Sequence, residues 1–109
     1  MRTSFTAVIE QANVYTGAFA TEPYEAAWAL EARWFVNILE LDQEEGGSVT
    51  LIPEISPDGL TWCAEGSPGL TFTEPGLQSL PLTNFGGWLR LRTETTGTAK
   101  YLIYLSLKG

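Results

Sequence analysis

Apolar and polar residues alternate with a period of two along most of the chain, which is the pattern of half-buried β-strands. Residues 5–9 alternate in this way and predict a first strand, and residues 13–20 predict a second. Residues 33–41 predict a strand that is buried on both faces, because apolar side chains occur at both parities. Residues 48–56 predict a further strand. Pro53 lacks a backbone N–H, so this strand is expected to lie at a sheet edge or to carry a bulge.

The clearest turn signal follows directly, at Ser56-Pro57-Asp58-Gly59. Proline at the second position, aspartate next and glycine last predict a type I turn, in which Gly59 is free to take a positive φ. Asp58 is expected to accept hydrogen bonds from its own backbone. Residues 60–64 are therefore predicted to return as the antiparallel partner of residues 48–56.

The end of the chain shows the same alternation in two segments. Trp88–Glu94 and Lys100–Lys108 flank Thr96-Gly97-Thr98, so the pattern predicts a C-terminal hairpin across Gly97. Between the two predicted hairpins, residues 65–84 are rich in Gly, Pro, Ser and Thr. Short strands are expected there near residues 70–73 and 77–82, separated by Pro75-Gly76.

Residues 21–42 open on an ambiguous segment. Residues 25–32 have strong helix propensity, but neighbouring sheet structure often overrides propensity, so a strand is favoured over a short helix. Taken together, the pattern predicts an all-β protein: an antiparallel β-sandwich or jelly roll of about eight strands with at most one short helix. Residues 1–109 are expected to form a single domain.

The composition is consistent with this fold and limits the classes of molecule that the chain is expected to bind. The chain has 109 residues, 44% of them hydrophobic, which suffices for one core without disulfides. Six basic residues stand against thirteen acidic ones, and a net charge of −7 repels phosphates and anionic lipids. We therefore expect no nucleic-acid partner and no membrane partner. Without a signal-peptide pattern, the expected location is the cytoplasm, unless the chain belongs to a phage particle.

Candidate chemistry is limited by what the chain lacks. It has no histidine and one cysteine, Cys63, which removes histidine-based catalysis and zinc sites. We expect no catalytic residue, no cofactor and no metal. Cys63 is expected to be a buried, inert thiol. The acidic residues at 40, 42, 44 and 45 have oxygen ligands of the kind that calcium binds, but a solvated, charged turn is the favoured interpretation.

The aromatic and basic residues offer the one surface that the sequence singles out. Trp88, Arg90 and Arg92 share a strand face, and tryptophan and arginine are enriched at interface hot spots. We treat these three residues as a candidate interface. The alternative is that the arginines pair with Glu94 and other acids. The edge at residues 48–55 is a second place where a partner subunit is expected. Each of the four tryptophans is expected in the core, with sugar platforms or interface anchors as the alternative.

The back half resembles a known group of proteins. Its motifs are Ser56-Pro-Asp-Gly-Leu-Thr-Trp62, Phe85-Gly-Gly-Trp-Leu-Arg-Leu-Arg92, Gly97-Thr98 and the closing segment 101–109. Across residues 33–109 this order is similar to small β-sandwich proteins from tailed-phage and prophage structural-gene clusters.

The resemblance implies a non-enzymatic, virion-associated or phage-derived structural or assembly protein. It would act through contacts with itself, as a homo-oligomer, or with other structural proteins, and would be located in the virion. A carbohydrate-binding β-sandwich module with a glycan partner is the alternative, based on the tryptophans. A small enzyme that uses only carboxylates is a third hypothesis.

Overall fold

The computed structural model of the chain describes residues 4–42 and 46–109, and every helix or strand in these residues is a β-strand. The strands are β1 (Ser4–Ala20), β2 (Tyr24–Glu25), β3 (Glu31–Leu41), β4 (Ser48–Ser56), β5 (Cys63–Ala64), β6 (Leu70–Phe72), β7 (Gly76–Thr83) and β8 (Trp88–Lys108). All pairings are antiparallel and join the eight strands into one curled sheet. The predicted all-β fold of sandwich or jelly-roll type is confirmed.

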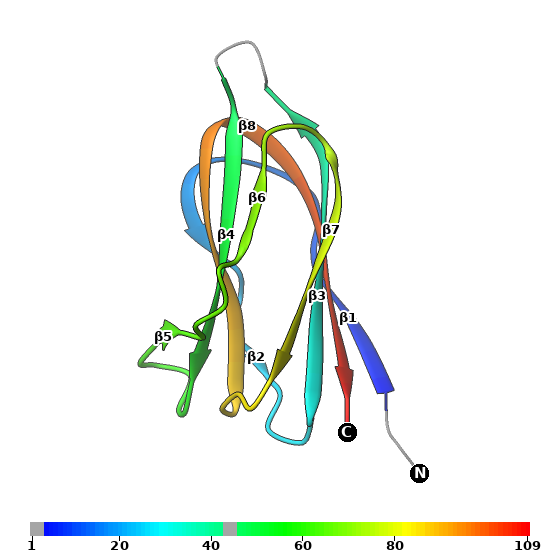
Figure 1. Cartoon of the computed structure of the whole chain (residues 1–109), viewed down its shortest axis with the longest axis vertical. Coiled ribbons are helices and arrows are strands. Elements are labelled where there is room, and N and C mark those ends of the chain that lie inside the picture. Colours follow the sequence, from blue (N-terminus) through cyan, green and yellow to red (C-terminus); the bar gives the residue numbers. More distant parts are fainter. Residues whose placement is uncertain (1–3, 43–45) are drawn as a thin grey trace.

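A long bent ribbon of β1 and β8 organises the sheet. The two strands pair from Ser4 opposite Lys108 to Ala20 opposite Arg92. Figure 1 shows both strands rising in one layer, arching over together and descending in the other layer. Gly97 lies at the bend with a φ of 81°, and the Thr16 hydroxyl donates to its carbonyl oxygen over 2.7 Å. The ribbon therefore contributes to both layers.

Each half of β8 supports a different set of strands. The C-terminal half pairs with β3, and β3 pairs with β7, so one layer has the order β1, β8, β3, β7. The N-terminal half pairs with β4, which carries the short strands β5 and β6 on its other side. β2 and the end of β1 lie on the far side of this half. The two layers face one another in Figure 1.

The core fills the space between these layers, with alternate side chains from each long strand. Trp34 of β3 and Tyr101 of β8 are its largest fully buried side chains. At the bend, Tyr15 stacks on Phe19 with ring centroids 3.8 Å apart, and both rings meet Tyr101 edge-on. The Tyr101 hydroxyl is hydrogen-bonded to Thr95, and burial raises the pKa of Tyr101. Aromatic packing thus supports the ribbon where it bends.

The predicted C-terminal hairpin is wrong. Trp88–Lys108 is one continuous strand, and its two halves pair with β4 and β3 instead of with each other. Gly97 takes the positive φ that a turn would need, but here it bends a strand. Because the strand continues through this bend, one half pairs with β4 and the other with β3, and local turn signals cannot reveal these distant partners.

The N-terminal segment differs from the prediction in a related way. Residues 5–9 and 13–20 belong to the single strand β1, because register shifts absorb the break in alternation between them. Residues 25–32 form neither a full strand nor a helix. They hold the end of β2, a turn in which the Ala29 amide donates to Ala26, and the start of β3.

The structure also corrects two predictions about β4 and its partner strand. β4 is not an edge strand, since β8 lies on one side and β5 and β6 on the other. Pro53 is tolerated because it lies between the residues that pair with β6 and those that pair with β5. Its carbonyl accepts from the Glu65 amide, so its missing N–H faces this gap. The predicted return strand at residues 60–64 is confirmed only for Cys63–Ala64.

Other expectations hold. Strands near residues 70–73 and 77–82 are confirmed as β6 and β7. The strand at residues 33–41 is confirmed as β3, although its second face is only half-buried: Trp34, Val36 and Ile38 are buried, whereas Leu39 is exposed.

The bend at Gly97 is open to a direct test. Gly97→Ala is expected to lower the free energy of unfolding by about 1–2 kcal/mol, because a side chain at this positive φ is strained. Gly76→Ala is the matched control, since Gly76 has no positive φ and open space around it. Urea unfolding of both variants would measure the difference. Equal stability of the two variants would contradict the role given to the bend.

Candidate docking surfaces

The face predicted from Trp88, Arg90 and Arg92 forms as expected. Arg90 and Arg92 alternate with buried Leu89 and Leu91, so the arginines point away from the core. Register with β4 places Glu54 directly opposite Arg90. The sequence did not identify Glu54 as the partner, because that pairing joins residues far apart in the chain.

Ion pairs occupy this face. Arg90 Nε lies 2.7 Å from Glu54 Oε1, and Arg92 lies 3.7 Å from the same carboxylate. Arg92 Nη1 also lies 3.0 Å from Glu94. The Arg90 guanidinium covers the Trp62 ring at 4.3 Å from its centroid. The arginines are therefore paired with acids, as the alternative interpretation expected, and an interface at Trp88, Arg90 and Arg92 stays a prediction.

The turn beside this face is held by its own side chains. Asp58 Oδ1 accepts from the Leu60 and Thr61 amides at 2.8 and 2.9 Å, and Ser56 Oγ accepts from Gly59 at 2.8 Å. Gly59 has a φ of 79°, as predicted. A Cβ there would lie 3.0 Å from the Trp88 indole, so Trp88 packs on the turn. The Thr61 and Leu60 amides and the Ser56 hydroxyl together hold the pKa of Asp58 below its usual 3.8.

The other candidate residues do not gather into a reactive site. Cys63 is exposed, so the expectation of a buried thiol is wrong; the strand it begins has only two residues and lies outside the core. Glu44 and Glu45 of the acidic segment lie outside the described residues. Among residues 4–42 and 46–109, no cluster of three or more His, Cys, Asp or Glu side chains is arranged to hold a metal. The same residues contain no helix that could span a membrane.

The four tryptophans lie in different environments. Trp34 is fully buried, Trp62 and Trp88 are half-buried, and Trp28 is exposed. The expectation of core positions is thus confirmed for Trp34 alone. Because a guanidinium covers Trp62 and the Ser-Pro turn packs on Trp88, neither ring is a bare platform. Carbohydrate binding stays a prediction.

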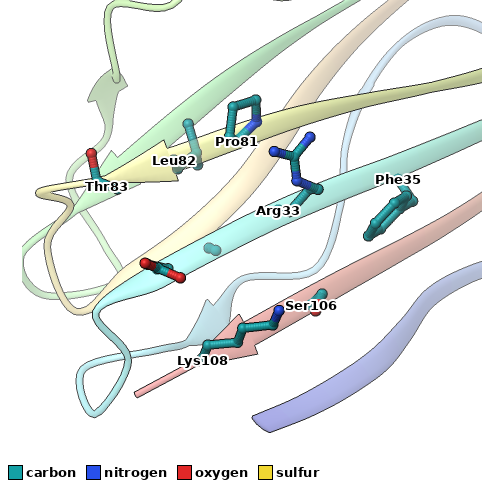
Figure 2. A pocket seen from close by; sticks show the side chains of 9 residues that line it. Arg33, Phe35, Pro81, Leu82, Thr83, Ser106 and Lys108 are labelled. Carbon is teal, nitrogen blue, oxygen red and sulfur yellow. The ribbon is translucent and has the colours of Figure 1, made fainter. Parts of the chain in front are cut away.

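A groove that the sequence did not reveal lies on the outer face of the opposite layer. Its volume is about 490 Å³, and Figure 2 shows its lining from three adjacent strands. Arg33 and Phe35 come from β3, and Lys108 comes from β8. Arg33 Nη1 donates to Ser79 Oγ at 2.8 Å. Most of the β3 residues that line the groove are odd-numbered. The sequence predicted that both faces of β3 are buried, so it gave no reason to expect a groove on this face.

Apolar side chains continue from the groove across the same outer face. Register aligns Val8, Tyr104 and Phe35 in one row across β1, β8 and β3. In the next row, Asn37 of β3 lies between Leu102 of β8 and Leu77 of β7. We call Val8, Phe35, Leu77, Leu102 and Tyr104 the outer apolar band. Val8 is 52% exposed and Leu77 is 63% exposed.

Comparison with known proteins gives a likeness in structure only. No protein-family model matches the chain, and no curated protein matches it at a significant level. The PBSX exported protein XepA is similar over 94% of this chain at 11% identity, with a TM-score of 0.71. The chain spans 36% of the length of XepA.

Two further solved structures share the fold. A protein in the structure of infectious bursal disease virus, Gx strain, is similar over 98% of this chain and 32% of its own, with 11% identity and a TM-score of 0.58. The SPBc2 prophage-derived protein YomS is similar over 100% of this chain and 96% of its own, with 9% identity and a TM-score of 0.52. The fold is thus one found in prophage and virus proteins, consistent with the phage-type resemblance of the sequence.

The ion pairs predict a difference between two carboxylates. Glu54→Gln is expected to destabilise the fold by about 1 kcal/mol, because Glu54 is 12% exposed and contacts both arginines. Glu94→Gln should change stability by less than about 0.5 kcal/mol, because Glu94 is 60% exposed. Urea unfolding at neutral pH measures both values. A larger loss for Glu94→Gln would contradict the assignment.

The turn predicts a dependence on pH. A lowered folded-state pKa means that Asp58 stabilises the fold above pH 3.8, and that this contribution is lost as pH falls through the folded value. A carboxyl-detected NMR titration should give Asp58 a midpoint below 3.8. The stability difference between the wild type and Asp58→Asn should shrink as the pH is lowered through that midpoint. A midpoint at or above 3.8 would exclude these hydrogen bonds in solution.

Proposed function

We propose that this chain is a non-enzymatic structural or assembly protein of a phage particle that acts through protein–protein contacts. The outer apolar band is its docking surface for another structural protein of the particle. The observation that carries the proposal is that this band leaves apolar side chains outside the core on four adjacent strands, exposed at Val8 and Leu77 and half-buried at Phe35, Leu102 and Tyr104. Apolar surface outside the core of a small protein often marks an interaction site.

The chemistry around the band suits a protein partner. Arg33 and Lys108 line the groove beside it, and Lys100 follows on the same strand face of β8. Three of the six basic residues of an acidic chain therefore share the face that carries the apolar band. Apolar side chains rimmed by polar and charged groups are typical of protein interfaces.

Two independent features support the particle context and the non-enzymatic role. The fold is similar to that of prophage and virus proteins, over nearly the whole of this chain. The full sequence has no histidine, the residue that most often acts as a general acid or base. A scaffold that binds through a sheet face needs no such residue.

Particle association tests the proposal. Phage particles produced by a strain that carries the gene would be purified on a density gradient and analysed by quantitative mass spectrometry. The protein is expected in the particle fraction at a constant ratio to the major structural proteins. Intact particles that lack the protein, together with normal particle yield after gene deletion, would overturn the proposal.

A matched pair of variants tests the surface. Leu77→Asp is expected to reduce incorporation into particles at least about tenfold, because it places a charge in the apolar band. Leu60→Asp is the control: Leu60 is 85% exposed, and it lies on the turn beside β4 in the other layer. Circular dichroism would check that both variants fold. Equal incorporation of the two variants would exclude the band as the docking surface.

A further inference from the structure

The edges of the sheet are protected unequally. β7 ends one side of its layer and carries Pro81, which lacks the N–H that a further strand would need. In the other layer, β5, β6 and β2 have only two or three residues each. Short edge strands and prolines prevent unwanted pairing. β1 has 17 residues and no proline, and in the described residues it pairs with β8 alone.

β1 also lacks exposed charge. Its one charged residue, Glu10, is 9% exposed and accepts hydrogen bonds from Asn13 Nδ2 at 2.7 Å and Tyr15 Oη at 3.0 Å. Apolar side chains lie exposed instead: Phe5 is 50% exposed, and Val8 belongs to the outer apolar band. Charged side chains, which commonly prevent edge pairing, are therefore missing from this edge.

Bulges limit how much of the edge a partner strand could use. Register shifts fall between Val8 and Glu10, between Gln11 and Asn13, and between Thr16 and Gly17. Each shift interrupts the regular spacing of hydrogen-bonding groups. Ser4–Val8 remains as a straight run of five residues opposite Tyr104–Lys108. This run is long enough for a short antiparallel pairing.

We propose that a second copy of this chain pairs with Ser4–Val8, antiparallel about a two-fold axis at Thr6. Thr6 then faces the partner's Thr6 on the outer face. Phe5 faces the partner's Ala7 on the core side, and Ser4 faces the partner's Val8. The proposal rests on the structural role proposed above and names a first partner for it.

Three features favour a second copy over a different protein. Ser4–Val8 is self-complementary, because each large side chain meets a small one when the strand is turned about Thr6. Two copies with a net charge of −7 repel each other, and this run brings them together without a carboxylate. Pairing would also place the outer faces of the two copies side by side in one continuous sheet, with Val8 of each copy next to Ser4 of the other.

Charge at the axis tests the proposal. Thr6→Lys places two ammonium groups directly opposite each other and is expected to weaken dimerisation at least about tenfold. Val14→Lys is the matched control: it makes the same charge change on an exposed residue of β1 beyond two register shifts, so it should dimerise as the wild type does. Light scattering over about 1–100 µM brackets a dimer of micromolar affinity. Thermal unfolding would confirm that both variants fold.

Cross-linking gives an independent reading of the register. In a Cys63→Ser background, Thr6→Cys is expected to form a disulfide-linked dimer under mild oxidation, whereas Val14→Cys should remain monomeric on a non-reducing gel. A wild-type chain that stays monomeric, a Thr6→Lys dimer as tight as wild type, or equal cross-linking at both positions would overturn the proposal. These measurements use purified protein, so they can fail while particle association succeeds, and the reverse also holds.

Discussion

Pairing of β1 with β8 along their whole length is the interaction on which the rest of the structure depends. β8 has 21 residues and places about half of its length in each layer. Its backbone hydrogen bonds with β1 therefore continue from one layer into the other. The bend requires a residue that tolerates a positive φ, and Gly97 supplies it. β3 and β4 can then extend the sheet on opposite halves of β8, and their inner side chains meet in one core.

The same ribbon gives the two outer faces different chemistry. Around the N-terminal half of β8, Arg90 and Arg92 meet the carboxylates of Glu54 and Glu94, and the face is satisfied within the chain. Around the C-terminal half, Tyr104 and Leu102 leave apolar surface outside the core. The ribbon also sets the edges, because β1 lies outermost beside β8 while β4, which was expected to lie at an edge, is enclosed. The apolar outer surface and the open edge of β1 thus lie on the layer that contains the C-terminal half of β8.

Local signals in the sequence predicted local structure well. The Ser-Pro-Asp-Gly turn forms with the predicted hydrogen bonds to Asp58, since all of its interactions lie within a few residues. Alternation placed Arg90 and Arg92 on a common outward face. It could not identify the groove at Arg33 and Phe35, because aromatic and aliphatic residues on both faces of β3 concealed which face was covered. How deeply a side chain is buried depends on which distant segments pack against it, and the alternation of residues along the chain does not specify those segments.

The sequence by itself determined the class of fold, most of the strands and the direction in which many of their side chains point. A period of two reports these properties, because side chains alternate along any extended backbone. Only the tertiary structure decided which strands pair, whether Gly97 turns the chain back or bends it, and which edge stays open. Those outcomes depend on hydrogen bonds between distant segments, such as Glu54 with Arg90 in neighbouring strands. A glycine has the same freedom in a hairpin and in a bent strand, so the available partner strands decide between them.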